Sequence, residues 1–279
     1  MSRFLRHGFK SILRHPKNTL KQLGANLRGF RVGQSWESHY PKSLPTRTDA
    51  ENLRPNPLRT YFDGHKEGHG IYKWLHYFDV YHHHFKKFVG REVHIVEVGI
   101  YSGGSLEMWK EYFGDGCRIY GIDIEDSCKI YAKAGVEVFI GDQADRNFWR
   151  EFKRKVPAID ILIDDGGHTP KQQIVTLEEM VPHLRTGGVY LCEDIHGPNN
   201  LYSAYMAGLA RNLNVWKLQR GEDLAARPSE FQREIHSIHH YPYLTIIEKL
   251  DAPIELFVAP RHGTLWQPFL DSGLPPNRS

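Results

Sequence analysis

The sequence predicts an α/β fold in which a mostly parallel sheet is covered by helices on both faces. Short apolar runs and helix-like segments alternate between residues 93 and 192, and most of the runs lead into an acidic residue. Strands buried on both faces are continuously apolar, and their alternation with helices is typical of parallel sheets. With 279 residues, the chain can form one large domain and an extension.

The N-terminal region differs in charge from the rest. Residues 1–36 contain eight Lys or Arg and no Asp or Glu, whereas the remainder contains 28 basic and 33 acidic residues. Apolar residues at helix-like spacing over 3–28, with a break at Pro16, indicate a basic amphipathic segment. A solvated arm, a weak peripheral membrane contact through residues 1–31 and a targeting peptide all remain open. The net acidic remainder gives no indication of nucleic-acid binding.

Composition then limits the domain plan and the compartment. Residues 31–58 are rich in Pro, Ser, Thr and Asn, which indicates a linker. We therefore expect an arm and linker over 1–60 and a domain over 61–279 with its core at 91–250. No apolar run approaches 18 residues, so no transmembrane helix is predicted. Three cysteines without C-x-x-C spacing predict reduced structural thiols, no zinc site and a cytoplasmic location, with membrane contact left open.

The individual elements follow in chain order. An aromatic-rich helix is expected over 69–88, on which His69, Tyr72 and His76 share a face that either packs or covers a substrate pocket. Consecutive helical residues point in different directions, so His82, His83 and His84 are not expected to share an ion. The predicted strands are 93–98, 118–123, 136–140, 159–163 and 187–192; the predicted helices are 104–113, 126–134, 145–155 and 170–184. A long insertion over 196–232 precedes an edge hairpin of 234–240 and 243–249.

The first strand leads into a glycine-rich loop that suits a nucleoside-type cofactor. Gly99, Gly103 and Gly104 permit a tight turn and close backbone approach, and Ser105 is the expected cap of the next helix. The G-x-G-x-x-G dinucleotide pattern is absent. Asp123 ends the second strand, where an acidic residue can bind ribose hydroxyls, and Asp142 with Gln143 follow the third.

Acidic residues also follow the fourth and fifth strands. Asp164 and Asp165 precede Gly-Gly-His168, and Glu193 with Asp194 follow the fifth strand. Ligands of open α/β sheets bind at this carboxyl edge, so the two clusters can converge on one cation. A plain turn or helix cap is the alternative for Asp164, Asp165 and His168.

These motifs resemble those of the class I S-adenosylmethionine-dependent methyltransferases. Residues 95–196 resemble in particular the metal-dependent macrolide sugar O-methyltransferases of the mycinamicin and macrocin type, with their Asp-x-x-His and paired acidic motifs. The resemblance implies a Rossmann-like, mostly parallel seven-stranded sheet with an antiparallel edge hairpin. It implies that Asp165, Glu193 and Asp194 bind Mg²⁺ (or Mn²⁺), and that His168 is the general base. The implied S-adenosylmethionine-binding residues are Glu97, Gly99, Ser102, Gly103, Ser105, Asp123, Asp142, Gln143 and Asp164.

The expected reaction is methyl transfer to a hydroxyl. Three carboxylates suit Mg²⁺, a coordinated hydroxyl loses its proton more readily, and imidazoles titrate near neutral pH. A small-molecule or glycan hydroxyl, on a sugar, glycoside or natural product, is the expected acceptor, and His196 can touch it. A homo-oligomer is compatible with the sequence. A catechol O-methyltransferase, a hydroxylase on this fold and a non-catalytic membrane-associated binding protein are the alternatives.

Overall fold

The computed structural model describes residues 16–39, 55–197, 199–215, 218–219, 224–260 and 262–263, in two units of residues 1–54 and 55–279. In the first unit, helix α2 (Pro16–Trp36) leads into the 3₁₀ helix η1 (Glu37–His39). Pro16 is the first residue of α2, a position at which no N–H donor is needed. Leu27, Phe30, Val32 and Trp36 on α2 are exposed. The arm before residue 16 and most of the expected linker lie outside the described residues.

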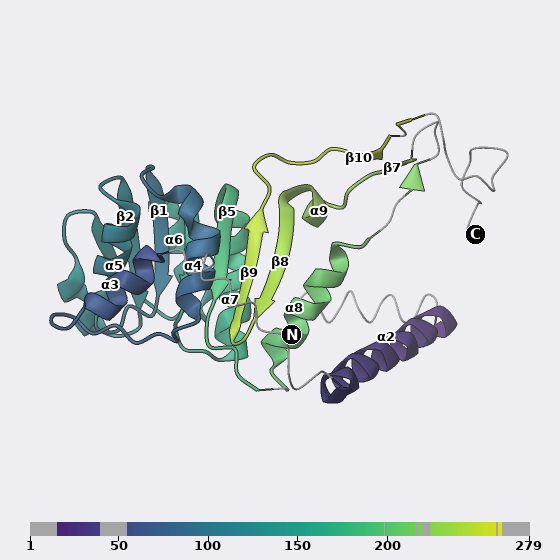
Figure 1. The fold of residues 1–279 in the computed structure, drawn as a ribbon, viewed down its shortest axis with the longest axis horizontal. Coiled ribbons are helices and arrows are strands. Elements are labelled where there is room, and N and C mark those ends of the chain that lie inside the picture. The colour runs from purple at the N-terminus through teal and green to yellow at the C-terminus, as the bar shows by residue number, and fades with distance from the viewer. Residues whose placement is uncertain are drawn as a thin grey trace. The chain divides into compact units, whose positions relative to one another are not determined.

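The second unit is built on a seven-stranded sheet of order β3-β2-β1-β4-β5-β9-β8 (Figure 1). Strands β1 to β5 are mutually parallel, whereas β9 runs antiparallel to β5 and β8 antiparallel to β9. The predicted α/β fold with its edge hairpin is thereby confirmed. The strands are β1 (Val93–Val98), β2 (Cys117–Asp123), β3 (Val136–Ile140), β4 (Ile159–Asp164), β5 (Leu184–Cys192), β8 (Ile235–Tyr241) and β9 (Leu244–Lys249).

Two buried apolar layers hold the helices on opposite faces of this sheet. One face packs against α3 (Pro57–Gly64), α4 (Tyr77–Phe85) and α5 (Gly104–Phe113). The other packs against α6 (Arg146–Lys155), α7 (Pro170–Met180) and α8 (Leu201–Asn212). Successive strand residues alternate between the two layers, as Ile161 and Leu162 of β4 show. The same alternation decides below where each acidic residue points.

Several connecting segments complete the unit. The 3₁₀ helices are η3 (Lys86–Phe88), η4 (Asp126–Tyr131) and η5 (Val181–His183). The insertion after β5 also contains β6 (Leu218–Gln219), β7 (Leu224–Ala226) and α9 (Glu230–Glu234), and β10 (Phe257–Ala259) joins β6 and β7 in a small antiparallel sheet. The three cysteines are buried and unpaired. In the part of the chain that the structure describes, no helix is both long and apolar enough to span a bilayer.

Three local predictions are wrong. The helix expected over 69–88 begins only at Tyr77, because residues 69–76 form a loop. The expected helix over 126–134 is the shorter 3₁₀ helix η4. The cap of α5 is Gly103, in the left-handed conformation, and the Ser105 hydroxyl instead donates to Glu97 Oε2 at 2.9 Å.

Candidate active site

A cavity of about 420 Å³ lies at the carboxyl edge of the parallel strands. The loops after β1, β2, β3, β4 and β5 and the 69–76 loop contribute to its wall. Of the predicted site residues, the cavity is lined by Gly99, Ser102, Ser105, Asp123, Asp142, Gln143, Asp165, His168 and Asp194. Glu97, Gly103, Asp164 and Glu193 do not line it. The predicted edge is therefore hollowed, but not every predicted side chain faces the hollow.

The glycine loop brings the tips of β1 and β4 into close contact. Gly99 has a φ of +83°, and a Cβ on it would lie 2.1 Å from the carbonyl oxygen of Asp165. Gly104 is equally confined, because a Cβ there would lie 2.2 Å from the carbonyl oxygen of His69. Only residues without a side chain permit these approaches. The loop thus sets the spacing between β1, the Asp165 loop and the 69–76 loop.

Asp123 organises the same loop from the end of β2. Its Oδ2 accepts a hydrogen bond from the backbone N–H of Tyr101 at 3.0 Å, and its Oδ1 accepts one from that of Glu125 at 3.0 Å. A carboxylate oxygen has a second lone pair, so both oxygens retain acceptor capacity toward the cavity.

Gln143 joins three segments of the site. Its amide Nε2 donates to Asp164 Oδ1 at 2.8 Å and to Thr176 Oγ1 at 3.0 Å, while its Oε1 accepts from the backbone N–H of Gly167 at 2.8 Å. Asp164 is 1% exposed, and its burial raises the pKa of its carboxyl to about 6. The side chain of Asp164 therefore points into the layer beneath α7 rather than into the cavity.

On the opposite face of the sheet, three carboxylates surround the ammonium group of Lys73. The Lys73 Nζ lies 2.5 Å from Asp165 Oδ2, 3.0 Å from Glu193 Oε2 and 4.0 Å from Glu97 Oε1. The side chain of Lys73 is 4% exposed, that of Glu193 1% and that of Glu97 0%. The 69–76 loop thus carries a cation into an acidic cluster that would otherwise be buried without a counter-ion. Such a cluster without a counter-ion is strongly unfavourable.

Burial and charge shift the protonation equilibria of this cluster in opposite directions. Burial alone lowers the pKa of Lys73, but the charges of Asp165, Glu193 and Glu97 outweigh it and raise that pKa. Burial, with the charge of Asp165 added, raises the pKa of Glu193 to about 8. Burial likewise raises the pKa of Glu97. The ammonium group therefore stays charged while the two buried glutamates hold their protons more readily.

Asp194 lies beside this cluster on the open side. Its Oδ1 accepts hydrogen bonds from the hydroxyl of Tyr77 at 2.8 Å and the indole Nε1 of Trp74 at 3.2 Å. His168 Nε2 lies 3.8 Å from Asp194 Oδ2 and 4.0 Å from Asp165 Oδ1, and its side chain is 38% exposed. Thr169, not His168, caps α7 through a capping box with Gln172. The imidazole of His168 is therefore free to face the cavity.

The backbone at this edge is held in an uncommon conformation. The described non-glycine residues with positive φ are Tyr101, His168, Asp194 and Tyr243, with φ of 45°, 54°, 55° and 62°. The first three line the cavity, and the ring of Tyr243 packs against Trp74 and His196. Such conformations concentrate at functional sites.

The remaining histidines named in the sequence have local partners. His196 Nε2 lies 3.8 Å from Asp194 Oδ1, next to the site. His69 packs edge-on against Tyr131, and His76 Nε2 bonds to the carbonyl oxygen of Pro242 at 3.0 Å. Tyr72, 94% exposed, lines the cavity mouth. His69, Tyr72 and His76 therefore belong to a loop rather than to one helical face.

The sequence did not predict the side chains that donate hydrogen bonds to the acidic residues. These are Lys73, Trp74, Tyr77 and Tyr81, the last of which donates to Glu193 Oε1 at 2.7 Å. From the sequence, only the two tyrosines could have been placed together, because residues four apart share one face of a helix. Lys73 and Trp74 precede the helix, and nothing in the sequence indicates their partners.

Comparison with known proteins is consistent with this geometry. A sequence model of a family described as a methyltransferase domain matches residues 96–195. The matched segment runs from β1 to the residues that follow β5, which is the part of the sheet that forms the cavity. The chain is similar to demethylmacrocin O-methyltransferase of Streptomyces fradiae, with 32% identity over 202 residues, 63% of this chain and 50% of that protein. It is also similar to mycinamicin VI 2''-O-methyltransferase of Micromonospora griseorubida, with 33% identity, 63% of this chain and 49% of that protein.

A solved structure resembles the domain as well. The MycE methyltransferase from the mycinamycin biosynthetic pathway, in complex with Mg and SAH, has a TM-score of 0.58 and 25% identity, covering 71% of this chain and 55% of that one. The chain spans about half the length of the curated relatives it matches. The predicted resemblance to macrolide sugar O-methyltransferases is thereby confirmed.

Proposed function

We propose that this chain transfers the methyl group of S-adenosylmethionine to a hydroxyl group of a sugar, in a glycoside or a glycosylated natural product. The observation that carries the proposal is the convergence of His168, Asp165 and Asp194 beside the glycine loop in one cavity. The relatives, named as O-methyltransferases acting on macrolide and tetracenomycin sugars, support the same reaction.

The cavity wall fits S-adenosylmethionine. Gly99 and Ser102 of the glycine loop line the cavity, and Asp123 offers lone pairs to ribose hydroxyls. Within the described residues, Glu97 Oε1 is buried and accepts no hydrogen bond. Glu97 does not line the cavity, and its Oε1 lies 4.0 Å from Lys73 Nζ, so it contributes to the charge balance behind the wall. Asp164 and Gln143 support this wall from behind, through their bonds to each other and to Gly167.

The donor set also fits a hard dication, though not through all three predicted carboxylates. Ligand atoms of Asp165, His168 and Asp194 lie within 4.8 Å of one another. Both oxygens of Glu193 instead face Lys73, at 3.1 and 3.0 Å. Asp165 meets Lys73 through Oδ2 alone, at 2.5 Å, and its Oδ1 faces His168. We therefore assign Mg²⁺ binding to Asp165 and Asp194, with Glu193 hydrogen-bonded to Lys73 through both of its oxygens. A bound Mg²⁺ supplies positive charge that makes a coordinated hydroxyl more acidic.

His168 then acts as the general base. Its Nε2 takes the proton of the acceptor hydroxyl, and the carboxylates of Asp194 and Asp165, at 3.8 and 4.0 Å, stabilise the resulting imidazolium. The acceptor oxygen forms a bond to the methyl carbon as the carbon–sulfur bond breaks, giving a methyl ether and S-adenosylhomocysteine. The enzyme contributes position and charge to this in-line displacement.

An acceptor screen followed by mass spectrometry tests the proposal. Sugars, glycosylated natural products, glycolipids and catechols are incubated with S-adenosylmethionine, with and without Mg²⁺ and after EDTA treatment. We expect Mg²⁺-dependent methylation of a sugar hydroxyl. Methylation of catechols alone, or cofactor binding without turnover of any acceptor, would favour the alternatives, and full activity after EDTA would remove the metal from the mechanism.

Variants separate the roles of the residues. His168→Ala should reduce turnover by about 10²- to 10⁴-fold while the Kd for S-adenosylmethionine stays unchanged, because general-base catalysis contributes that much. Asp165→Ala should lose both activity and its response to Mg²⁺. His236→Ala, an exposed histidine on β8, is the matched control and should behave as the wild type.

Contact with anionic membranes through residues 1–31 is a separate proposal, supported by the eight basic residues of this region. The exposed Leu27 and Phe30 of α2 add apolar side chains beside Arg28 and Arg31. Co-sedimentation with anionic vesicles should therefore be weaker for residues 37–279 than for the full chain, and equal sedimentation would contradict the idea. Light scattering on the same preparations measures the oligomeric state.

A further inference from the structure

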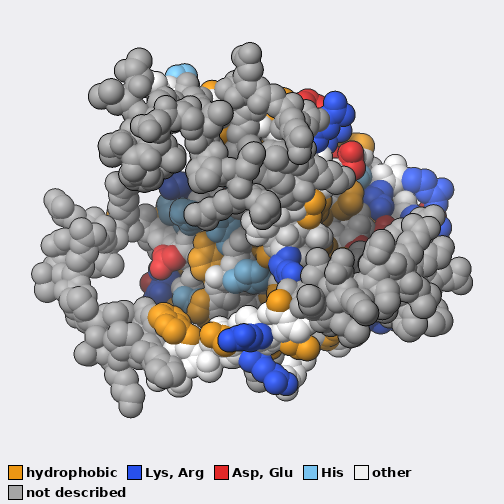
Figure 2. All heavy atoms as spheres, turned by 90° about the vertical axis from the view of Figure 1, so that its right-hand side faces the viewer, with side chains coloured by type: hydrophobic (Ala, Val, Ile, Leu, Met, Phe, Trp, Pro, Cys, Tyr) orange, Lys and Arg blue, Asp and Glu red, His pale blue; other side chains and the backbone are white. Residues whose placement is uncertain are grey.

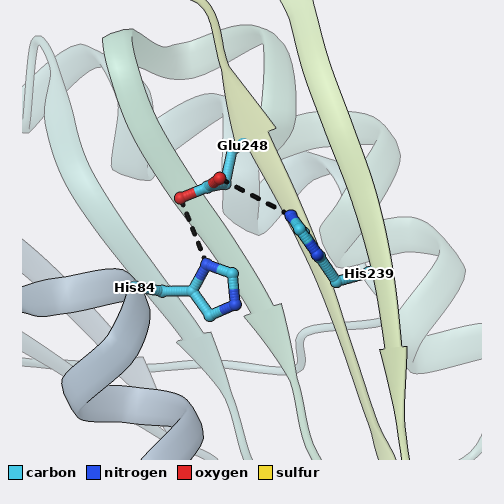
Figure 3. Close-up of side chains that lie close together, drawn as sticks. All are labelled: His84, His239 and Glu248. Atoms are coloured by element: carbon cyan, nitrogen blue, oxygen red, sulfur yellow. Dashed lines mark hydrogen bonds and ion pairs between the residues drawn. The ribbon is translucent and has the colours of Figure 1, made fainter.

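A second cluster of metal-binding side chains lies near the antiparallel edge of the sheet. His84 extends from α4, His239 from β8 and Glu248 from β9, and the three side chains point toward one another (Figure 3). His84 Nδ1 lies 3.1 Å from Glu248 Oε1, and His239 Nε2 lies 3.6 Å from Glu248 Oε2. Three segments distant in the sequence thus place two imidazoles around one carboxylate.

The surroundings favour imidazole nitrogens that are available as ligands. His84 Nε2 lies 2.9 Å from the hydroxyl oxygen of Tyr241. In the metal-free cluster His84 Nδ1 donates to Glu248 Oε1 at 3.1 Å. When a metal is bound, Nε2 carries the proton and donates it to Tyr241, and Nδ1 presents its lone pair to the centre of the cluster. Metal-binding histidines usually donate their second nitrogen in this way.

The site is accessible from water on one side. The His84 side chain is 1% exposed, whereas that of Glu248 is 17% and that of His239 34% exposed. Seen from the β8 side of the molecule, histidine side chains are visible among hydrophobic and charged ones (Figure 2). An ion can therefore enter from the β8 side and keep a water ligand there.

The geometry points to a zinc-class transition-metal site formed by His84, His239 and Glu248. The three ligand atoms lie within 4.8 Å of one another. Ligand atoms in a tetrahedral zinc site, with bonds of about 2.0–2.1 Å, are separated by roughly 3.3 Å, so rotation of the more exposed side chains suffices to close the site. Two imidazoles and one carboxylate are a known zinc donor set, whereas Mg²⁺ prefers oxygen ligands.

The ammonium group of Lys87 has to move away before a metal can bind. Lys87 Nζ lies 3.5 Å from Glu248 Oε1, and its side chain is 40% exposed. A long and exposed side chain can turn into water at little cost, since exposed ion pairs contribute about 0–1 kcal/mol. Ser237 Oγ, 2.9 Å from His239 Nε2 and 3.3 Å from Glu248 Oε2, would likewise turn away.

The consequence of metal binding concerns α4. This helix carries Tyr77 and Tyr81, whose hydroxyls donate to Asp194 and Glu193. A metal that joins α4 to β8 and β9 would hold these donors in place from outside the active site. The role of the ion is therefore structural, and the inference does not depend on the proposed methyl transfer.

Metal uptake by the full-length protein tests the inference. The protein is stripped with EDTA, titrated with Zn²⁺ by calorimetry, and examined with Co²⁺, whose visible absorption reports tetrahedral nitrogen and oxygen ligation. We expect one equivalent of Zn²⁺ per chain that persists in Asp165→Asn, and a melting temperature that rises with Zn²⁺. A metal-free hydrogen-bonded network instead predicts no stoichiometric uptake, and that result would overturn the inference.

Neighbouring histidines provide the matched variants. His239→Ala and Glu248→Gln should each weaken Zn²⁺ binding at least tenfold, whereas His240→Ala, the exposed next residue on β8, should leave it unchanged. Circular dichroism shows that each variant is folded before titration. If His239→Ala and Glu248→Gln both bind Zn²⁺ like the wild type, the ion binds elsewhere and the assignment is wrong.

Discussion

Replacing Gly99 by Ala tests how closely the tips of β1 and β4 must approach. The new Cβ would lie 2.1 Å from the carbonyl oxygen of Asp165, 2.7 Å from its carbonyl carbon and 2.9 Å from Gly166 Cα, all of which are backbone atoms. A contact of ordinary length requires a backbone displacement on the order of 1 Å. The overlap should cost about 1–3 kcal/mol, and the positive φ of +83° adds about 1–2 kcal/mol.

Gly90→Ala separates these two contributions. Gly90 has a φ of +74°, but a Cβ there would meet no atom within 4 Å. It should therefore lose only the conformational part, about 1–2 kcal/mol. For a domain of this size, each kcal/mol lowers the melting temperature by roughly 2–4 °C. We expect decreases of roughly 4–20 °C for Gly99→Ala and 2–8 °C for Gly90→Ala.

Activity gives the second measurement. Displacing Asp165 by about 1 Å should lower kcat/KM by about 10²-fold, because misplacement of that size disrupts positioning. Gly90 follows η3 and precedes β1, at the edge of the sheet opposite to the cavity, so its variant should retain activity. Thermal melts and methyl-transfer kinetics on both variants decide the matter. Equal melting temperatures and equal kcat/KM values for the two variants would refute the close-approach argument.

Three further predictions concern buried charges and thiols. Lys73→Met leaves Asp165 and Glu193 without their ammonium partner and should lower the free energy of unfolding by about 3–5 kcal/mol; an unchanged urea midpoint would show that the acidic cluster needs no cation. The hydrogen bond with His84 is the main cause that lowers the pKa of Glu248 from 4.5 to about 2, so this carboxylate stabilises the fold above pH 4.5 and the gain is lost as the pH falls toward 2. In metal-free buffer, Glu248→Gln should therefore be less stable than the wild type by about 2 kcal/mol at pH 7, with the gap closing in melts at pH 3; a gap that does not depend on pH would contradict this. Burial raises the pKa of every cysteine thiol, so iodoacetamide at pH 8 should label none in the native protein and all in urea, and rapid native labelling would contradict the packing of Cys117, Cys128 and Cys192.

The sheet could be predicted because its signal is local. Each parallel strand is an apolar run bounded by polar residues, and the observed bounds of β1 and β3 agree with the predicted 93–98 and 136–140. The edge hairpin also follows from alternation around Tyr241 and Pro242. The 69–76 loop could not be predicted in this way, because its aromatic residues have the spacing of a helix and its sequence is therefore as compatible with a helix as with a loop. Its conformation follows from the Lys73 contact, which spans 92 residues to Asp165 and 120 to Glu193.

The sequence by itself determined that acidic residues end neighbouring parallel strands, and this placed them at one edge of a parallel sheet. Only the tertiary structure decided which way each side chain points. Asp164 and Asp165 are adjacent, yet the pleat of β4 sends Asp164 toward Gln143 and Asp165 toward Lys73. Likewise, Glu193 points toward the buried ammonium group of Lys73, whereas Asp194 lies on the open side near His168. The physical reason is that a buried carboxylate needs a partner, and here the partner is a lysine from a loop far away in the sequence.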